Sequence, residues 1–527
     1  MPSAFPQLTK SIRSITIAES GDRNLWRNWP IVLSALFAFG WIVHRAVVQS
    51  ITLDEADTFR LWVAPLSPAY WHPHSNNHVL NSMLMRLSIW LFGVSALTLR
   101  MPALLGGFLY IFAACRLCTL LTGNLMLAWT LFVCLAYNPF IMDYLVAARG
   151  YGLALGFLAL TMYLIAGMLF ENAPSEHAIR RYITGISACA GLSVCANFSF
   201  AFADSLLLIL AATLASLWMI RQKFGIGTWI RFGLACSLPA LAVMLVLAGS
   251  ALTQFPRTQL FWGANSLAES YSEIRHSSFA ELNPYLVNPL LASLLKEFEH
   301  HALKLVTLPA LVYLALLFFA RRQEREPVKS RLLLAACLSS ALVLAISAHW
   351  LQFRMLKIPL PLERTGLWSV PLFTAAVGAV LSVVPSNRMQ RVVRTLATAF
   401  LMVVATYFIG ELRDSYFREW RNDSEVKAAF PAVLDLCRRA GVREVPSSFN
   451  LTSSLNFYKD LYHVSAIDSF SNFDTMPSDR PVYVLEESLY VDFIRAEGLQ
   501  IAWHGAISDL VIAIRPGSTG ITTVGVP

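Results

Sequence analysis

Apolar runs about twenty residues long recur along most of this chain, and short polar segments separate them. A helix of that length crosses the hydrocarbon core of a bilayer. The hydrophobic pattern therefore predicts an all-α polytopic membrane module with about eleven spanning helices. The expected spans are residues 31–48, 101–118, 124–140, 151–170, 182–198, 201–220, 232–252, 303–320, 331–349, 367–385 and 394–411.

The apolar segment at residues 79–93 does not fit this pattern, because it is short and contains Asn81 and Arg86. If it crossed the membrane, every later loop would change side, and the basic loop at 321–331 would lie outside. Lys and Arg concentrate in cytoplasmic loops. When 79–93 is not counted as a span, seventeen of these residues fall on inside segments and ten on outer loops before the tail. We therefore predict an interfacial helix within a first outer loop, residues 49–100.

The hydrophobic pattern ends near residue 411, and a mixed polar tail follows. Residues 424–440 have helical spacing, and the apolar stretches at 481–485 and 509–514 are typical of strands. We expect residues 1–30 to be a cytoplasmic segment, residues 31–411 the membrane module, and residues 412–527 an extracytoplasmic α/β domain. The expected location is the cell membrane, in particular a bacterial inner membrane.

Composition agrees with a multi-pass membrane protein. Hydrophobic residues make up 56% of the 527 residues and charged residues only 14%, whereas soluble proteins usually have about 25% charged residues. The net charge of +8 does not indicate nucleic-acid binding, because most basic residues lie in loops beside apolar runs. Cys437 is the one cysteine outside the apolar segments, so the tail cannot form an internal disulfide.

Acidic and polar side chains gather directly after the first span. Asp54, Glu55 and Asp57 lie close together in the first outer loop. Acids beside a membrane span are costly and therefore indicate a functional site. The alternative is a solvated loop with helix-capping acids. The same loop continues with His72, His74, Asn76, Asn77, His78 and Asn81.

Two later outer loops place cations on the same side. The second outer loop, residues 138–150, contains Asp143 and Arg149 and leads into Tyr151. The planar guanidinium of an arginine suits a phosphate; the alternative is an interfacial arginine that snorkels or pairs with Asp143. The loop at 350–366 adds Arg354, Lys357 and Arg364. Glu297 and His301 could hold a cation, although a solvated helix is the simpler interpretation.

Short motifs in a fixed order resemble the GT-C superfamily of membrane glycosyltransferases, in particular the family 39 branch of protein O-mannosyltransferases and lipid A aminoarabinose transferases. The Asp54-Glu55 pair before Phe59 is similar to the acidic pair of that branch. The matching segments that follow are the His/Asn-rich stretch 72–82, Phe92-Gly-x-Ser95, Leu99-Arg100-x-Pro102, Asn138-Pro139, Ala148-Arg149-Gly150-Tyr151 and, weakly, Pro361-x-x-Arg364.

The resemblance implies an inverting transfer of a sugar from a polyprenyl-phosphate donor to an extracytoplasmic glycan, lipid or protein. Asp54 would be the base, and Glu55 would orient a substrate or help to hold a divalent cation. The donor phosphate would be bound by Arg149, Arg364 and Lys357, and the acceptor or sugar by His74, Asn77, His78, Asp143 and Tyr151.

The chain departs from the family pattern at two places. Ala147 stands where relatives carry an acid, and residues 75–82 replace a His-Pro-Pro-Leu element. Two other classes of function stay open. A transporter or flippase of lipid-linked sugars would need polar groups near the bilayer midplane, whereas the charges here gather at the outer rim. A non-catalytic scaffold would tolerate loss of both Asp54 and Glu55.

Overall fold

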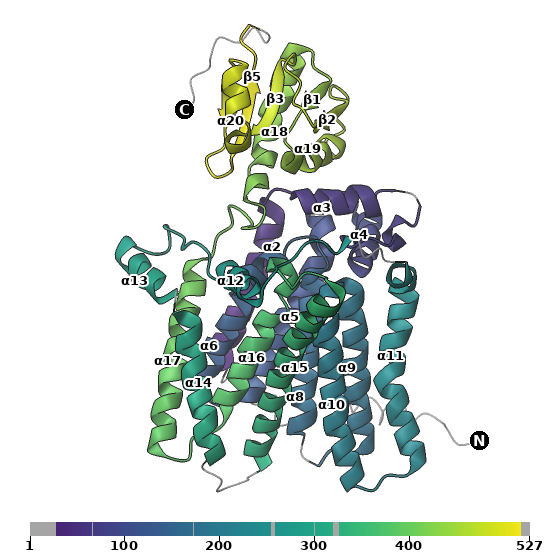
Figure 1. The fold of residues 1–527 in the computed structure, drawn as a ribbon, viewed down its shortest axis with the longest axis vertical. Helices are drawn as coiled ribbons and strands as arrows, with labels where there is room; N and C mark the ends of the chain where they lie inside the picture. The colour runs from purple at the N-terminus through teal and green to yellow at the C-terminus, as the bar shows by residue number, and fades with distance from the viewer. Residues whose placement is uncertain are drawn as a thin grey trace, which may run out of the picture.

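The computed structural model describes residues 28–65, 67–171, 173–254, 259–299, 301–319 and 326–517. Most of the predicted cytoplasmic segment, residues 1–27, and the last ten residues of the tail lie outside the described residues. The described chain forms a bundle of long, roughly parallel helices with a small α/β domain at one end (Figure 1).

Each of the eleven predicted spans coincides with a helix of the bundle. Within the described residues, eight helices are long and apolar enough to cross a membrane, and a ninth span results if α13 (Pro289–Glu299) and α14 are taken as one bent pair. Helix α6 is short, at 12 residues. The bundle helices are α2 (Trp29–Val48), α5 (Ala96–Leu121), α6 (Leu125–Ala136), α8 (Tyr151–Phe170), α9 (Glu176–Ala196), α10 (Ala201–Arg221), α11 (Ile226–Thr253), α14 (Ala302–Phe319), α15 (Glu326–Leu356), α16 (Ser369–Ser382) and α17 (Arg388–Gly410).

Glycine contacts hold α5 and α8 together at the centre of the bundle. A Cβ on Gly106 would lie 2.3 Å from the backbone of Gly152, and one on Gly156 would lie 2.6 Å from the carbonyl of Gly106. Small residues of this kind let membrane helices approach closely. A Cβ on Gly150 would lie 1.8 Å from the carbonyl oxygen of Ala196, so the start of α8 is also fixed against the end of α9.

Short helices cover the end of the bundle that carries the α/β domain. The segment predicted as an interfacial helix forms α4 (Val79–Phe92), which is labelled beside α3 at this end in Figure 1 and leaves Trp90 78% exposed. The other short elements are α3 (Leu53–Thr58), the π-helical turn η3 (Phe59–Val63), η4 (Ala69–Trp71), α7 (Pro139–Tyr144), η5 (Phe198–Phe200), α12 (Leu267–Ser278), α13 and η7 (Glu363–Gly366).

The C-terminal domain contains the helix and both strands predicted from its sequence. Its three-stranded antiparallel sheet has the order β3-β5-β4, and a parallel pair β1-β2 lies next to it through a bridge between Ser447 and Val484. The elements are η8 (Arg421–Asp423), α18 (Val426–Ala440), β1 (Glu444–Pro446), α19 (Phe449–Leu461), β2 (Ser469–Ser471), β3 (Val482–Glu486), α20 (Glu487–Ala496), β4 (Gln500–His504) and β5 (Leu510–Ile514).

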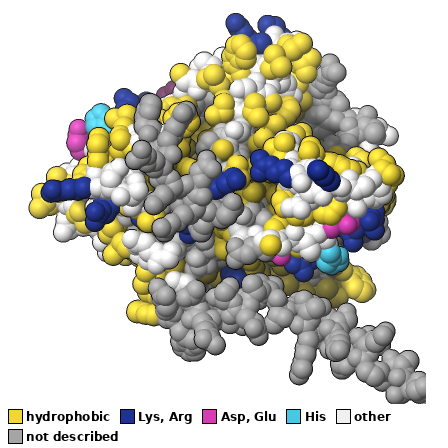
Figure 2. Space-filling view, turned by 90° about the horizontal axis from the view of Figure 1, so that it is seen from below, with side chains coloured by type: hydrophobic (Ala, Val, Ile, Leu, Met, Phe, Trp, Pro, Cys, Tyr) yellow, Lys and Arg dark blue, Asp and Glu magenta, His cyan; other side chains and the backbone are white. Residues whose placement is uncertain are grey.

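The opposite end of the bundle carries the basic loops. Figure 2, which views the molecule from that end, shows more Lys and Arg side chains than Asp and Glu side chains on the described surface. Arg221 ends α10, Lys223 follows it, and Arg388 and Arg391 lie in the first turn of α17. This distribution matches the one used to predict the sidedness of the loops.

Candidate functional site

The first turn of α3 fixes the position of Asp54. Thr52 precedes this helix, and its hydroxyl accepts a hydrogen bond from the Glu55 amide, while the Glu55 carboxylate accepts one from the Thr52 amide. This reciprocal arrangement is a capping box, which satisfies two amide groups at a helix N-terminus. Asp54 lies between these two residues, so its backbone has little freedom to move.

Asp54 lies between two arginines that come from distant parts of the sequence. Its Oδ2 accepts a hydrogen bond of 2.9 Å from Arg364 Nη1, on η7. Its Oδ1 lies 3.8 Å from Arg149 Nη2, in the second outer loop. Trp420 Nε1 also donates to Oδ2, at 3.2 Å. The structure therefore brings together three of the residues that the sequence predicts to carry the chemistry.

The protonation of Asp54 depends on these neighbours. Burial by itself would raise the pKa of the Asp54 carboxyl, because a charged group loses hydration. The positive charges of Arg149 and Arg364 and the hydrogen bond from Trp420 outweigh burial and lower the pKa below its usual value. Asp54 is therefore a carboxylate at neutral pH.

Glu55 and Arg100 form a fully buried ion pair below Asp54. Arg100 Nε donates to Glu55 Oε1 at 2.8 Å, and Arg100 Nη2 donates to Glu55 Oε2 at 2.7 Å. The remaining guanidinium hydrogens bind the carbonyl oxygens of Ala46, Gln49 and Ser50 at the end of α2. One arginine on α5 therefore ties the end of the first membrane helix to the helix that carries Asp54.

Glu55 also fixes the second outer loop. Its Oε1 accepts a hydrogen bond of 2.6 Å from the amide of Ala148, directly before Arg149. Both carboxylate oxygens are thus engaged by protein groups, and the side chain is 0% exposed. Such an environment does not suit the substrate contact or cation binding expected of Glu55 from the sequence. We interpret Glu55 as a residue that positions both Asp54 and Arg149.

Arg149 is buried, and its guanidinium group contacts residues of the first outer loop. Its Nη1 donates to the Thr58 hydroxyl at 2.9 Å and to the Asp54 carbonyl at 3.3 Å, and its Nη2 donates to Asn76 Oδ1. It does not pair with Asp143, which was the structural alternative considered from the sequence. Asp143 instead accepts 2.6 Å and 2.8 Å hydrogen bonds from Arg45 Nη2 and from the Arg418 amide.

A cavity of about 440 Å³ opens beside the charged cluster. Arg364, Asn76, His78 and Tyr151 line one part of it. The His78 and Tyr151 rings lie edge to face with centroids 5.2 Å apart. Burial, followed by the nearby arginines, keeps the pKa of His78 well below its usual value, so its imidazole is neutral. These groups can form hydrogen bonds and ring contacts with a sugar.

Two of the other three residues predicted to bind the acceptor or sugar, Asn77 and His74, shape the loop and do not line this cavity. The Asn77 amide donates to the carbonyls of Tyr70 and His72 at 2.9 Å, and its Oδ1 accepts from the Ser82 hydroxyl. The ring of His74 packs on Trp62 with centroids 5.3 Å apart.

Asp143 and Lys357 lie away from this cavity. Asp143 lines a separate polar cavity of about 970 Å³, whose wall also includes Glu299, Glu411 and Arg413. Lys357 is exposed after the end of α15, with a positive φ of 58°, and is not among the residues that line the cavity beside Asp54.

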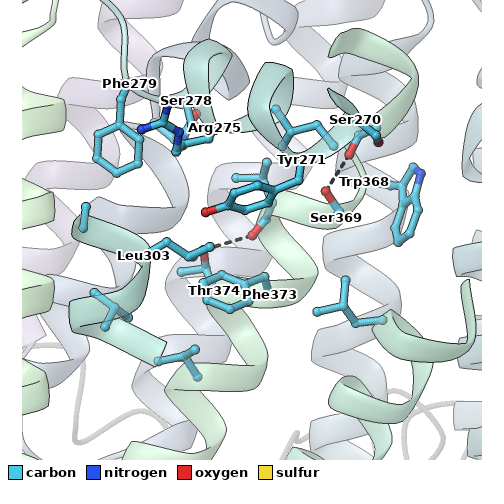
Figure 3. A pocket seen from close by; sticks show the side chains of 18 of the residues that line it. Ser270, Tyr271, Arg275, Ser278, Phe279, Leu303, Trp368, Ser369, Phe373 and Thr374 are labelled. Carbon is cyan, nitrogen blue, oxygen red and sulfur yellow. Dashed lines mark hydrogen bonds between the residues drawn. The ribbon is translucent and has the colours of Figure 1, made fainter. Parts of the chain in front are cut away.

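An apolar cavity of about 410 Å³ lies between the helices of the bundle, and Figure 3 shows side chains that line it. It shares His349, Leu360 and Pro361 with the cavity beside Asp54. Its wall is formed by side chains from α12, α14, α15, α16 and α17, including Phe373 and Leu303. A polar cavity and an apolar one thus meet near Arg364.

Sequence reasoning missed two side chains of the linker between α17 and the C-terminal domain. Glu419 accepts hydrogen bonds from Arg364 Nη1 and from the Tyr144 hydroxyl, and the adjacent Trp420 donates to Asp54. Burial raises the pKa of the Glu419 carboxyl, although the charge of Arg364 opposes this shift. Neither residue belongs to a recognisable motif, and both lie more than 360 residues after Asp54.

The described residues contain no group of three or more His, Cys, Asp or Glu side chains placed to hold a metal ion. Glu297 and His301, at the junction of α13 and α14, have no third such ligand beside them in this part of the chain. A divalent cation remains an expectation from the sequence alone.

We predict that Glu55→Gln destabilises the protein strongly, because it leaves the buried Arg100 charge without its counter-ion. Removing one partner of a buried pair costs about 3–5 kcal/mol. Thermal unfolding in detergent should show a large decrease in the midpoint. Asp414→Asn, in a half-exposed pair with His44, is the matched control and should change the midpoint little. Equal midpoints for both variants would refute the structural role of Glu55.

Comparisons with known proteins agree with the fold. No protein-family model matches the sequence, and no curated protein matches it. The structure of ArnT from Cupriavidus metallidurans bound to undecaprenyl phosphate matches with a TM-score of 0.50 and 12% identity, covering 96% of this chain and 100% of that chain. ArnT from the same organism in the apo state gives a TM-score of 0.41 and 11% identity over 93% and 98% of the two chains. The chain thus has the polytopic fold of lipid-bound ArnT, in agreement with the GT-C resemblance of its sequence.

Proposed function

We propose that this protein is a membrane glycosyltransferase that moves a sugar from a polyprenyl-phosphate donor to an acceptor. The observation that carries the proposal is the convergence of Arg149 and Arg364 on the Asp54 carboxylate, beside a polar cavity that continues into an apolar one. A polyprenyl-phosphate sugar has the same three parts: an apolar chain, an anionic phosphate and a polar sugar. The ArnT structure that shares the fold contains undecaprenyl phosphate, which supports this assignment.

The cavities suggest where each part of the donor lies. The polyprenyl chain enters the apolar cavity between α14, α15 and α16, and the phosphate lies near Leu360 and Arg364, where the two cavities meet. The sugar then occupies the polar cavity, beside His78 and Tyr151. Electrostatic attraction to preorganised arginines stabilises the phosphate as it departs.

The reaction is a direct displacement at the anomeric carbon. The acceptor hydroxyl oxygen attacks that carbon while its proton passes to Asp54, and the bond between the carbon and the phosphate oxygen breaks with its electrons on the phosphate. A single displacement inverts the configuration at the anomeric carbon. Asp54 acts as the general base, and no group of the protein forms a covalent bond to the sugar.

Donor binding makes Asp54 a stronger base. In the structure, Arg149 and Arg364 lower the pKa of Asp54, which weakens it as a proton acceptor. A donor phosphate shares the positive charge of both arginines, so part of their attraction for Asp54 is lost. The pKa of the carboxylate then rises toward the value that proton transfer requires.

We also propose that the site faces the extracytoplasmic side of a cell membrane, such as a bacterial inner membrane. The basic loops lie at the opposite end of the bundle, and such loops are typically cytoplasmic. Asp54, both cavities and the C-terminal domain would then lie outside, where a flipped lipid-linked donor presents its sugar.

Asp54→Asn should lower turnover about 10²–10⁴-fold, because the amide cannot accept the proton. The assay incubates purified protein with a panel of polyprenyl-phosphate sugars and measures freed polyprenyl phosphate. The control is Asp492→Asn, since the Asp492 side chain is 96% exposed in the C-terminal domain. Near-normal turnover in Asp54→Asn would remove the base assignment. Donor translocation without sugar release by the wild type would indicate a flippase instead.

Arg364→Gln should raise KM for the donor and shift the acidic limb of the kcat/KM profile to higher pH. Arg364 lowers the pKa of Asp54, so its loss raises that pKa, and the base becomes protonated at a higher pH. The activity of the wild type should persist at a pH where the variant is already inactive. Arg354→Gln, in the last turn of α15, is a control, because Arg354 does not line the cavity beside Asp54. Unchanged KM and pH profile in Arg364→Gln would show that Arg364 does not act on the donor or on Asp54.

A membrane-impermeant maleimide should label Asp492→Cys in intact cells, and Lys223→Cys only after permeabilisation. Both positions lie in exposed segments, at opposite ends of the bundle. The unmodified protein gives the background from its own cysteines. Labelling of Lys223→Cys alone in intact cells would invert the proposed orientation.

A further inference from the structure

Residues of the C-terminal domain hold the segment that carries Asp54. The amide of Leu53, the residue before Asp54, donates a 2.9 Å hydrogen bond to Asp423 Oδ2, and the Ser454 hydroxyl donates to Asp423 Oδ1 at 2.6 Å. The amide of Ile51 donates to the Tyr458 hydroxyl at 2.9 Å. Two amides at and just before the start of α3 therefore bind acceptors from η8 and α19, some 370 to 410 residues later in the chain.

Side-chain contacts extend this attachment along α3. The Ser453 hydroxyl donates to Asp57 Oδ1 at 2.5 Å. The ring of Phe59 packs edge to face on Phe457 with centroids 5.6 Å apart. Ile51, Ala56, Phe59, Trp62 and Val63 belong to the same hydrophobic core as Val426, Phe430, Leu455 and Phe457. The first outer loop and the C-terminal domain are thus one packed unit.

Helix α3 needs such support because it has only six residues. Isolated helices of this length are unstable, and their first amide groups have no partner within the helix. The capping box satisfies the Glu55 amide, and Asp423 satisfies the Leu53 amide. The position of Asp54, one residue further along, depends on both contacts.

We propose that the C-terminal domain completes the catalytic centre, and that Asp423 is a positioning residue that orients Asp54 by capping α3. This inference rests on the proposed function, in which Asp54 is the base. Asp423 does not touch the arginines that bind the donor phosphate, so its loss changes the chemical step and not the binding of the donor. Displacement of a catalytic group by about 1 Å can lower the rate by as much as 100-fold.

The ionisation of Asp423 offers a second test of the inference, through the pH dependence of the rate. Burial, together with the nearby carboxylates of Asp54 and Glu55, raises the pKa of Asp423 to about 8, so it is neutral at pH 7. The positively charged groups that face these acids are Arg100, which pairs with Glu55, and Arg149 and Arg364, which both pair with Asp54. Above about pH 8, ionised Asp423 adds a negative charge close to Asp54, so the pH profile of the wild type should change there.

The test compares Asp423→Ala, Asp423→Asn and the exposed control Asp492→Asn in the purified full-length protein. Asp423→Ala should lower kcat about ten- to 100-fold and leave the donor KM within about twofold. Asp423→Asn keeps an acceptor for the Leu53 amide, so it should restore kcat at pH 7 and remove the change in the pH profile above about pH 8. Hydrogen–deuterium exchange should be faster for residues 51–58 in Asp423→Ala only. If Asp423→Ala does not fold, Ser454→Ala, which removes one hydrogen bond to Asp423, should lower kcat several-fold.

Normal kcat and normal exchange in Asp423→Ala, or normal kcat in Ser454→Ala if the first variant does not fold, would overturn the inference. So would faster exchange at 51–58 with unchanged kcat, because capping would then be structural only. Asp54→Asn separates these results from a failure of the proposed function. If Asp54→Asn is inactive and Asp423→Ala behaves as the wild type, the function stands and the positioning role is refuted.

Discussion

The buried pair of Glu55 and Arg100 is the contact on which the arrangement of the site depends. Arg100 binds both Glu55 oxygens and three carbonyls at the end of α2, and Glu55 also binds amides of α3 and of the second outer loop. Four segments that would otherwise be independent thus share one pair of side chains. Burying two charges is expensive unless all their hydrogen-bonding groups are satisfied, and here the carboxylate meets that condition. The main effect of the pair is therefore to fix a single defined geometry around Asp54, and not to add net stability.

That geometry explains how a carboxylate can stay charged at the edge of a membrane. Asp54 is largely buried, which raises its pKa, and the two arginines together with hydrogen bonds from Trp420 and Asn76 outweigh burial and keep its pKa low. Arg364 Nη1 donates hydrogen bonds to both Asp54 and Glu419. A donor phosphate entering this cluster would take the place of part of that negative charge. In the proposed function, donor binding would therefore alter the basicity of Asp54.

The sequence predicted the bundle well, because apolar runs and basic loops report directly on membrane helices. All eleven predicted spans coincide with helices, and residues 79–93 form a separate short helix at the expected end. The meeting of Asp54, Arg149 and Arg364 could also be predicted, since all three were assigned to loops on one side. Asp143 could not be placed, because its partner Arg45 lies inside the first span and belongs to no motif.

The remaining parts of the site come from contacts between residues far apart in the chain. Glu55 resembles a catalytic acid in sequence, and only its burial against Arg100 identifies it as a positioning residue. Glu419 and Trp420 lie in the linker after the last membrane helix, Asp423 lies in η8 at the start of the C-terminal domain, and none of them belongs to a recognisable pattern. Nothing in a single sequence pairs such a linker with a loop some 370 residues earlier, because that contact depends on how the tail packs on the bundle.

The most direct test of the account is the structure of the protein with a bound polyprenyl-phosphate sugar. The account predicts that the phosphate oxygens lie within hydrogen-bond distance of Arg149 and Arg364, with the anomeric carbon of the sugar facing Asp54 across space for an acceptor hydroxyl. A phosphate bound away from both arginines, or a sugar whose anomeric carbon points away from Asp54, would contradict it.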